Sequence, residues 1–362
     1  MKRRIVIVMI CALMLSGAFL LTACNNEPTT TVPPTDQPPT NNQQNQQPPA
    51  DDNNGNGDVE PDDDWVMAPM TRLIMATGGV AGTYYPLGGA MAAVINNITN
   101  LQINANASGA SVDNMGQLFL GDADIALAQN DIISYALNGT EIWEVAGRQP
   151  VTNLATLMTL YPETIQIIVE AGSGIYSVDD LVGRRVSVGD IGSGTEANAM
   201  QILNAHGITS ADFTVINLGF GPSSEAMRDG NIDAAFITAA TPNPAVLDLS
   251  TARDLRILPL SDAAIRTLMN TYAFYAPITV TNADYEFVTD PVQTVAVQAT
   301  LVTTMDLDEQ VAYDIVRALI ENAGSVGHAR GAYITPENAV RYLSAPLHPG
   351  AERFFREIGA IS

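Results

Sequence analysis

Lysine is almost absent from this sequence. Of the 362 residues only Lys2 is a lysine, and the formal net charge at pH 7 is −23. A surface this acidic disfavours binding to nucleic acid and to anionic lipid head groups, because both require positive charge on the protein. It also provides no long-range attraction for an anionic solute. Any anion must therefore be held by local donors such as backbone N–H groups.

Cysteine is also scarce, and the two cysteines, Cys11 and Cys24, both lie in the first 24 residues. The remainder of the chain therefore has no disulfide, no thiol nucleophile and no cysteine-based metal site. Three histidines occur, and none has metal-ligand spacing with another. We therefore expect no metal and no other cofactor.

Serine and lysine motifs of common enzymes are missing as well. Ser193 lies in a G-x-G context and not in the G-x-S-x-G turn of hydrolases, and no lysine follows Gly194 as in a phosphate-binding P-loop. Because the sequence shows no acid–base constellation, catalysis is the least favoured of the function classes considered.

The first 64 residues have the composition of a leader and a spacer. A basic start is followed by an apolar stretch over residues 5–21, and the sequence LTAC at residues 21–24 resembles a bacterial lipobox. The resemblance implies a lipoprotein signal peptide over residues 1–24, with Cys24 lipidated and the protein held outside the cell membrane; the alternative is an uncleaved membrane helix. Residues 25–64 are rich in Pro, Asn, Gln and Asp, which predicts a disordered acidic tether.

The most informative stretch is residues 187–199 (SVGDIGSGTEANA), which reads as strand, glycine loop and helix. The first N–H groups of a helix lack partners and its dipole is positive there, so this end favours an anion. The candidate ligand-binding residues at this helix end are Ser193, Gly194, Thr195 and Glu196. The alternative is a capping box, because Ser193 and Glu196 also fit the pattern S-x-x-E.

A second copy of this plan occurs earlier in the chain. An apolar run over residues 72–77 leads to a glycine loop containing Gly82 and Thr83, and a helix follows. Both copies continue into the pattern G-x-x-D-x-A, at residues 121–126 and 230–235. Two α/β lobes with facing helix ends create a cleft, where small ligands bind. Tyr84 and Tyr85 are both candidates, although adjacent helix residues face different sides.

Further candidates follow the other predicted strands, because ligands gather at the carboxyl ends of strands in α/β sheets. These residues are Ser108, Gly109, Gln129 and Asn130 in the first lobe and Thr238 in the second. Two strands over residues 154–160 and 165–169 are predicted to cross between the lobes. Lobe 1 is thus expected to comprise residues 70–162 and 290–362, and lobe 2 residues 163–289.

Three motifs together resemble the TAXI family of solute receptors that serve TRAP transporters. They are AGTYYPLGG at residues 81–89, GSGTE at 192–196 and PLHPGA at 346–351. The resemblance implies a type 2 periplasmic-binding-protein fold, in which two α/β lobes and a hinge close around a solute. It also implies a monomeric receptor that binds a small carboxylate, such as a glutamate-like amino acid, a dicarboxylate or a 2-oxo acid, and delivers it to a TRAP-type permease.

The role of the receptor and the class of its solute both remain open from the sequence. A sensory lipoprotein that presents its solute to a membrane receptor would have the same sequence features. In addition, Asp190 stands beside the second glycine loop, where the family commonly has a residue such as proline. An acidic group there weakens the binding of an anion unless it points away or meets an ammonium group of the solute.

Overall fold

The computed structural model describes residues 65–362. The predicted signal peptide, the lipidation at Cys24 and the tether lie outside the described residues. Within the described part of the chain, no helix is both long enough and apolar enough to cross a membrane.

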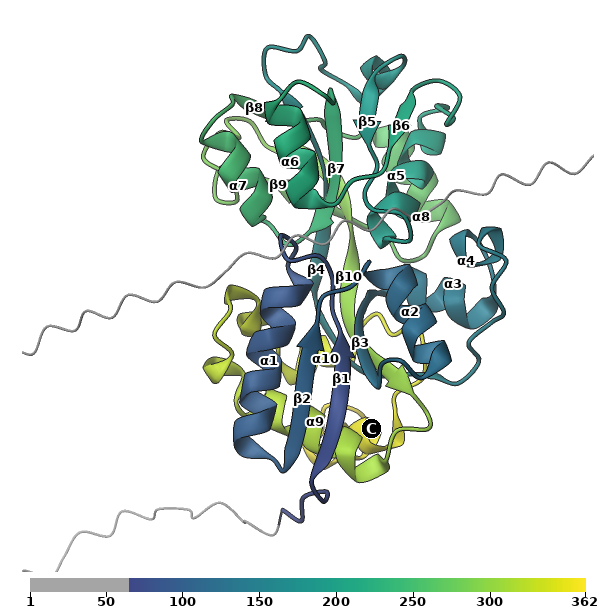
Figure 1. Cartoon of the computed structure of the whole chain (residues 1–362), viewed down its shortest axis with the longest axis vertical. Coiled ribbons are helices and arrows are strands. Elements are labelled where there is room, and N and C mark those ends of the chain that lie inside the picture. Colours follow the sequence, from purple (N-terminus) through teal and green to yellow (C-terminus); the bar gives the residue numbers. More distant parts are fainter. Residues whose placement is uncertain (1–64) are drawn as a thin grey trace, which may run out of the picture. The chain divides into compact units, whose positions relative to one another are not determined.

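Two α/β lobes follow one another along the chain and share long strands (Figure 1). The first lobe begins with β1 (Thr71–Ala76), α1 (Tyr84–Ile98), β2 (Leu101–Asn106), α2 (Ser111–Leu120), β3 (Ile125–Gln129), α3 (Asn130–Asn138) and α4 (Ile142–Val145). The second contains η1 (Val178–Leu181), β5 (Arg185–Ser187), α5 (Gly194–Ala205), β6 (Thr214–Ile216), α6 (Phe220–Arg228), β7 (Ala234–Ala239), α7 (Pro244–Ser250), β8 (Leu255–Ile257), α8 (Asp262–Thr271) and β9 (Ala276–Val280). The chain then returns to the first lobe with α9 (Glu309–Glu321), η2 (Ala323–Ser325), η3 (Ala329–Tyr333), α10 (Pro336–Ala339) and α11 (Pro349–Glu357).

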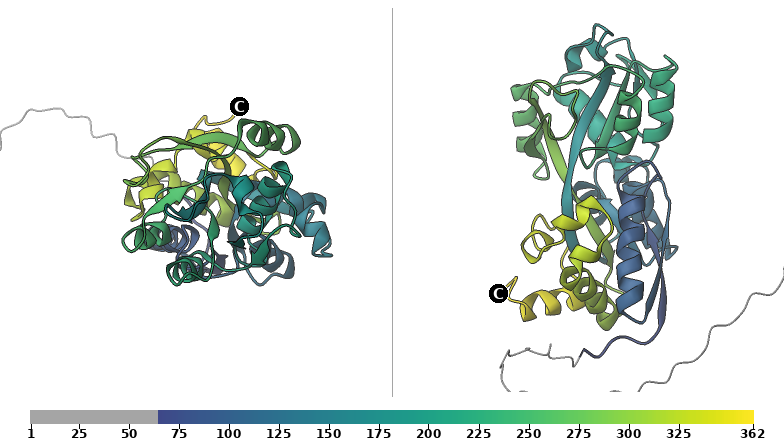
Figure 2. Two further views of the ribbon diagram at one scale, coloured as in Figure 1. Left: turned by 90° about the horizontal axis from the view of Figure 1, so that it is seen from above. Right: turned by 90° about the vertical axis from the view of Figure 1, so that its left-hand side faces the viewer.

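Two strands, β4 (Leu154–Glu170) and β10 (Val292–Thr304), connect the lobes. They lie side by side and antiparallel at the centre of a sheet with the order β2-β1-β3-β10-β4-β7-β5-β6. Figure 2 shows β4 running through both lobes. The sequence predicts two separate strands here, whereas the structure has one strand that is continuous through Tyr161 and Pro162.

Separate apolar cores stabilise the two ends of the crossing strands. In the first lobe Leu87, Met91 and Ile95 of α1 pack with β1, β3 and Leu301 of β10. Their spacing of four places them on one face of the helix. In the second lobe residues of α5, β5 and β7 pack with Ile167 of β4. Both lobes therefore depend on β4 and β10, so these strands position everything that lies between the lobes.

The repeated G-x-x-D-x-A pattern has the same structural role in both lobes. Asp124 accepts a hydrogen bond from the N–H of Ile74 at 2.7 Å, and Asp233 accepts one from the N–H of Arg185 at 2.8 Å. Each aspartate also donates its own N–H to the carbonyl of the same partner residue. The pattern therefore joins the start of β3 or β7 to the neighbouring first strand of its lobe.

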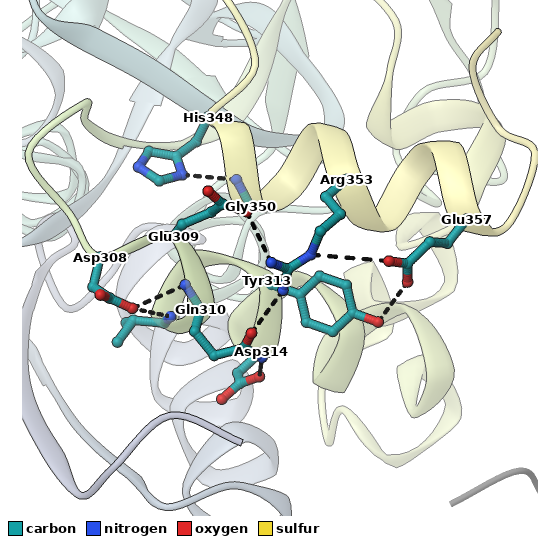
Figure 3. Close-up of polar contacts among 10 residues, drawn as sticks. Asp308, Glu309, Gln310, Tyr313, Asp314, His348, Gly350, Arg353 and Glu357 are labelled. Carbon is teal, nitrogen blue, oxygen red and sulfur yellow. Dashed lines mark hydrogen bonds and ion pairs between the residues drawn. The ribbon is translucent and has the colours of Figure 1, made fainter. Parts of the chain in front are cut away.

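The PLHPGA motif at residues 346–351 begins the last helix, α11, which packs against α9 (Figure 3). His348 is the N-cap of α11, where its Nδ1 accepts the N–H of Gly350, and its Nε2 lies 3.0 Å from the carbonyl oxygen of Leu307. Further along, Tyr313 donates to Glu357 at 2.6 Å, and Arg353 bonds to α9 through Glu309. This motif therefore stabilises the fold, and none of its residues lines the cavity described below.

Candidate functional site

A cavity of about 460 Å³ lies between the lobes. Its wall is built from the loop before α1, the loop before α2, the end of β3 and the middle of β4 on one side. The other side is built from the loop before α5, the start of α6 and the end of β7. The volume suits a small organic solute.

Nine of the thirteen predicted ligand-binding residues line this cavity. They come from both lobes and are Gly82, Thr83, Tyr84, Gly109, Gln129, Ser193, Gly194, Thr195 and Thr238. The four that do not line it are Tyr85, Ser108, Asn130 and Glu196. The structure thus brings together both glycine loops, as the sequence predicts.

The two adjacent tyrosines at the start of α1 face different sides. Tyr84 is only 7% exposed and lines the cavity, whereas Tyr85 is 38% exposed and points elsewhere. Successive residues of a helix are about 100° apart, so both rings cannot face one site. The structure therefore assigns Tyr84, and not Tyr85, to the cavity.

The other three residues are engaged in local hydrogen bonds. Ser108 Oγ accepts the N–H of Ala110, and Asn130 Oδ1 accepts the N–H of Gln298 at 3.0 Å. Glu196 accepts the N–H of Gly192 at 2.9 Å and also a bond from Asn217. These side chains shape the loops around the cavity without lining it.

The capping alternative for Ser193 is also realised in the structure. Ser193 Oγ accepts the N–H of Glu196 at 3.1 Å and is the N-cap of α5. The same residue lines the cavity together with Gly194 and Thr195. Capping and exposure to the cavity therefore occur at one loop, and the two interpretations do not exclude each other.

Four helices begin at the cavity wall. Their first residues are Tyr84 of α1, Ser111 of α2, Gly194 of α5 and Phe220 of α6, and all four line the cavity. Each helix has nine residues or more. Because each helix N-terminus carries partial positive charge and unpaired N–H groups, their convergence favours a negative group in a chain without nearby lysine.

Strand β4 supplies two residues that the sequence analysis did not identify. Tyr161 and Glu163 line the cavity and are 0% and 2% exposed. Both stand in a strand that is buried along almost its whole length. A carboxyl group in such a run is a signal that could have been recognised, because charged residues are almost never fully buried without a partner. Other lining residues outside the predicted set include Gly219, Phe220 and Glu225, together with Asp190, which the sequence places beside the second glycine loop.

Several buried polar atoms at the cavity have no hydrogen-bond partner within the described chain. Gln129 Nε2 donates to Glu163 Oε2 at 3.2 Å. This leaves Gln129 Oε1, Glu163 Oε1, Thr238 Oγ1 and the hydroxyls of Tyr84 and Tyr161 unsatisfied. Buried polar groups are normally paired, so five such atoms around one cavity indicate a site built for a polar ligand.

Burial controls the ionisation of these groups. It raises the pKa of the Glu163 carboxyl to about 8, with a further contribution from Asp131, while neighbouring Tyr84 and Gln129 oppose the rise. Burial also raises the pKa of the Tyr84 and Tyr161 hydroxyls, as does the nearby Glu163. Desolvation penalises the charged form of each group, so Glu163 is protonated at neutral pH in this environment.

The charged residues of the cavity wall are all acidic. They are Glu163, Asp190 and Glu225, and the lining includes no arginine, lysine or histidine. In the part of the chain that the structure describes, no group of His, Cys, Asp and Glu side chains is arranged to hold a metal ion. Among the groups that line the cavity, positive potential therefore comes from the helix ends.

The raised pKa of Glu163 predicts that substitution by glutamine stabilises the empty protein at high pH. The unfolded chain ionises this carboxyl near pH 4.5 and the folded chain near pH 8, so stability is lost as the pH rises across that window. We expect Glu163→Gln to have a higher melting temperature than the wild type at pH 8. Calorimetric melting should show this difference disappearing at pH 4–5, and an equal difference at both pH values would contradict it.

Comparison with known proteins places this fold among periplasmic binding proteins. The periplasmic binding protein BugD aligns with a TM-score of 0.52 and 11% identity, over 81% of this chain and 94% of that chain. The alkanesulfonate-binding protein SsuA from Xanthomonas axonopodis pv. citri aligns with a TM-score of 0.44 and 14% identity, over 80% and 84%. The two-lobed α/β architecture with crossing strands is the type 2 periplasmic-binding-protein fold. Residues 75–359 match the NMT1-like family over more than half of the 362 residues, and the chain belongs to that family.

Proposed function

We propose that this protein is an extracytoplasmic receptor that captures a small carboxylate-bearing solute between its lobes and delivers it to a membrane permease. The observation that carries the proposal is the convergence of four helix N-termini and five unpartnered polar atoms on one cavity of about 460 Å³. The fold shared with BugD, a periplasmic binding protein, supports an extracytoplasmic role.

The finer parts of the proposal rest on the sequence motifs. Residues 81–89 and 192–196 resemble those of TAXI receptors, which favours a TRAP-type permease as the partner of a monomeric receptor. The lipobox-like residues at 21–24 favour a lipid anchor at Cys24. Binding is favoured over catalysis because the cavity lining pairs none of its serines and threonines with a histidine or lysine base.

A ligand screen tests this function directly. Amino acids, dicarboxylates and 2-oxo acids would be compared by thermal shift, with hits measured by titration calorimetry. A ligand that binds only the folded state at 100 times its Kd stabilises it by about 2.7 kcal/mol. One site per chain is expected. Melting that responds to a neutral sugar or nucleoside, and to no carboxylate, would overturn the proposal.

Substitutions at the start of α5 separate binding from capping. Thr195 lines the cavity and is 4% exposed, so Thr195→Ala removes a donor next to the solute carboxylate. We expect a ten- to hundredfold loss of affinity, since a hydrogen bond to a charged group contributes about 1.5–3 kcal/mol. Ser193→Ala should lower stability by about 1 kcal/mol through loss of the N-cap. Unchanged affinity in both variants would mean that the solute binds elsewhere in the cavity.

A further inference from the structure

Hydrogen-bond donors and acceptors lie in different regions of the cavity. The helix ends that begin at Tyr84, Gly194 and Phe220 offer donors and positive potential. Strand β4 offers the opposite, because Glu163 is a buried carboxyl with one oxygen unpartnered. A ligand that satisfies both regions needs an anionic group and a separate donor group.

The region around Glu163 holds two acceptor oxygens without a hydrogen-bond partner in the described chain, although the Tyr84 hydroxyl lies beside this carboxyl group. Gln129 Nε2 already donates to Glu163 Oε2, and this orientation of the amide presents Gln129 Oε1 as a second unpartnered acceptor. Gln129 and Glu163 are each 2% exposed, so bulk water does not satisfy these atoms. Two unpartnered acceptors on hydrogen-bonded side chains, one of them a carboxyl oxygen, match an ammonium group, which has three donors and no acceptor.

Among the described residues, no cationic side chain lines the cavity to compensate its carboxyl groups. The lining contains Glu163, Asp190 and Glu225 and no basic side chain. Arg330, whose charge reaches Tyr161, is absent from the lining and donates to the carbonyl of Thr241. A solute with two carboxylates would place its second negative charge beside acidic groups with nothing to neutralise it.

From this geometry we infer that the solute is an α-amino acid of zero net charge, with its ammonium group bound by Glu163 and Gln129 and its carboxylate at the helix N-termini. The rest of the wall is largely apolar, which suits an uncharged side chain on the solute. It includes Val80, Ala110, Phe220 and Pro222. The inference rests on the proposed function and narrows it. It excludes dicarboxylates, 2-oxo acids and glutamate as preferred ligands.

The direction in which affinity changes with pH distinguishes an amino acid from a 2-oxo acid. Glu163 faces Tyr84 of α1, Tyr161 of β4 and Gln129 of β3, and the charge of Asp131 of α3 also acts on it. Its pKa of about 8 means that, below that pH, an ammonium group must displace a proton from Glu163 in order to bind. Amino-acid affinity should therefore rise between pH 6 and pH 8. A 2-oxo acid that accepts a bond from protonated Glu163 would show the reverse.

Matched probes test the inference by titration calorimetry. 2-Aminopentanoate carries an ammonium group at C2 where 2-oxopentanoate carries a carbonyl oxygen, and the two are otherwise alike. Glutamine and glutamate have nearly the same shape and differ in net charge. We expect 2-aminopentanoate to bind at least tenfold more tightly than 2-oxopentanoate, and glutamine more tightly than glutamate. Proton release on binding of 2-aminopentanoate at pH 6 should appear as a dependence of the heat on the buffer.

The variant Glu163→Gln provides the second test. It keeps the side-chain shape and an acceptor for Gln129, and removes the negative charge. We expect a ten- to hundredfold loss of affinity for 2-aminopentanoate and no loss for 2-oxopentanoate. Glu144→Gln makes the same chemical change at an exposed position of α4 that does not line the cavity, and it should leave both affinities unchanged.

The outcomes separate this inference from the proposed function. Tighter binding of 2-oxopentanoate or glutarate than of 2-aminopentanoate, with affinity falling as the pH rises, would overturn the amino-acid assignment and leave a carboxylate receptor. Tighter binding of glutamate than of glutamine would overturn the requirement for zero net charge. Failure of every carboxylate to bind would overturn the proposed function itself. The pH series uses the unmodified protein, so it decides the matter even if Glu163→Gln does not fold.

Discussion

Gly194→Ala is expected to reduce solute affinity at least tenfold. A Cβ atom at this position would lie 2.0 Å from Gln129 Oε1 and 2.4 Å from its Cδ, whereas real Cβ atoms essentially never approach another heavy atom within 3.0 Å. Gln129 is 2% exposed and cannot turn into solvent. The added methyl group must either push the amide away from Glu163 or separate the lobes at this point. Titration calorimetry with a ligand from the screen measures the loss.

Two further variants identify the cause of this loss. Gly89→Ala, in the middle of α1, places a Cβ atom where nothing lies within 4 Å and should leave affinity unchanged. Gly194→Ala combined with Gln129→Ala removes the clash, so the double variant should lose less affinity than the sum of the two single losses. Strict additivity would show that Gly194 and Gln129 act independently, contrary to the contact seen between the lobes.

Gly350→Ala should be the most destabilising single methyl addition in the first lobe. A Cβ atom there would lie 2.0 Å from the carbonyl oxygen of Glu309 and 2.7 Å from the backbone nitrogen of Tyr313. Both contacts are to the backbone of α9, which cannot rotate away as a side chain can. Overpacking typically costs about 1–3 kcal/mol, and we expect a value at or above the upper end. Thermal and denaturant unfolding measure the change.

The matched control for this variant is Gly324→Ala. A Cβ atom at Gly324 meets nothing within 4 Å and its backbone φ is not positive, so stability should change little. Gly350→Ala should also leave the cavity residues in place, because PLHPGA lies outside the cavity wall. If Gly350→Ala melts like the wild type, the packing of α11 on α9 contributes little to the stability of the lobe.

Local patterns in the sequence were sufficient to predict the helix ends at the site. Glycine-rich loops between an apolar run and a helix occur before α1 and α5, and both lie at the cavity. The prediction succeeded because backbone freedom at glycine and the unpaired N–H groups of a helix start are properties of a short segment. The paired G-x-x-D-x-A patterns likewise predicted two lobes of similar plan, and their aspartates make equivalent bonds.

Local patterns were insufficient where the direction of a side chain or a distant partner decided the outcome. Ser108, Asn130 and Glu196 were predicted at the cavity, but each bonds to nearby backbone or to Asn217. A polar side chain at a strand end or in a loop can either bond to the backbone around it or line the cavity. Only the folded arrangement of the loop determines which of these it does.

By itself, the sequence determined that residues 65–362 form two α/β lobes with glycine loops at helix N-termini. It also determined that this part of the chain has no disulfide, because it has no cysteine, and that its basic side chains are arginines and three histidines. Tertiary structure alone decided that β4 carries Tyr161 and Glu163 into the cavity, and that Gln129 of one lobe meets Gly194 of the other. These contacts join residues far apart in the chain, so no short segment contains them. The environment of Glu163, and with it the pKa of about 8, comes from burial between lobes and is a property of the fold.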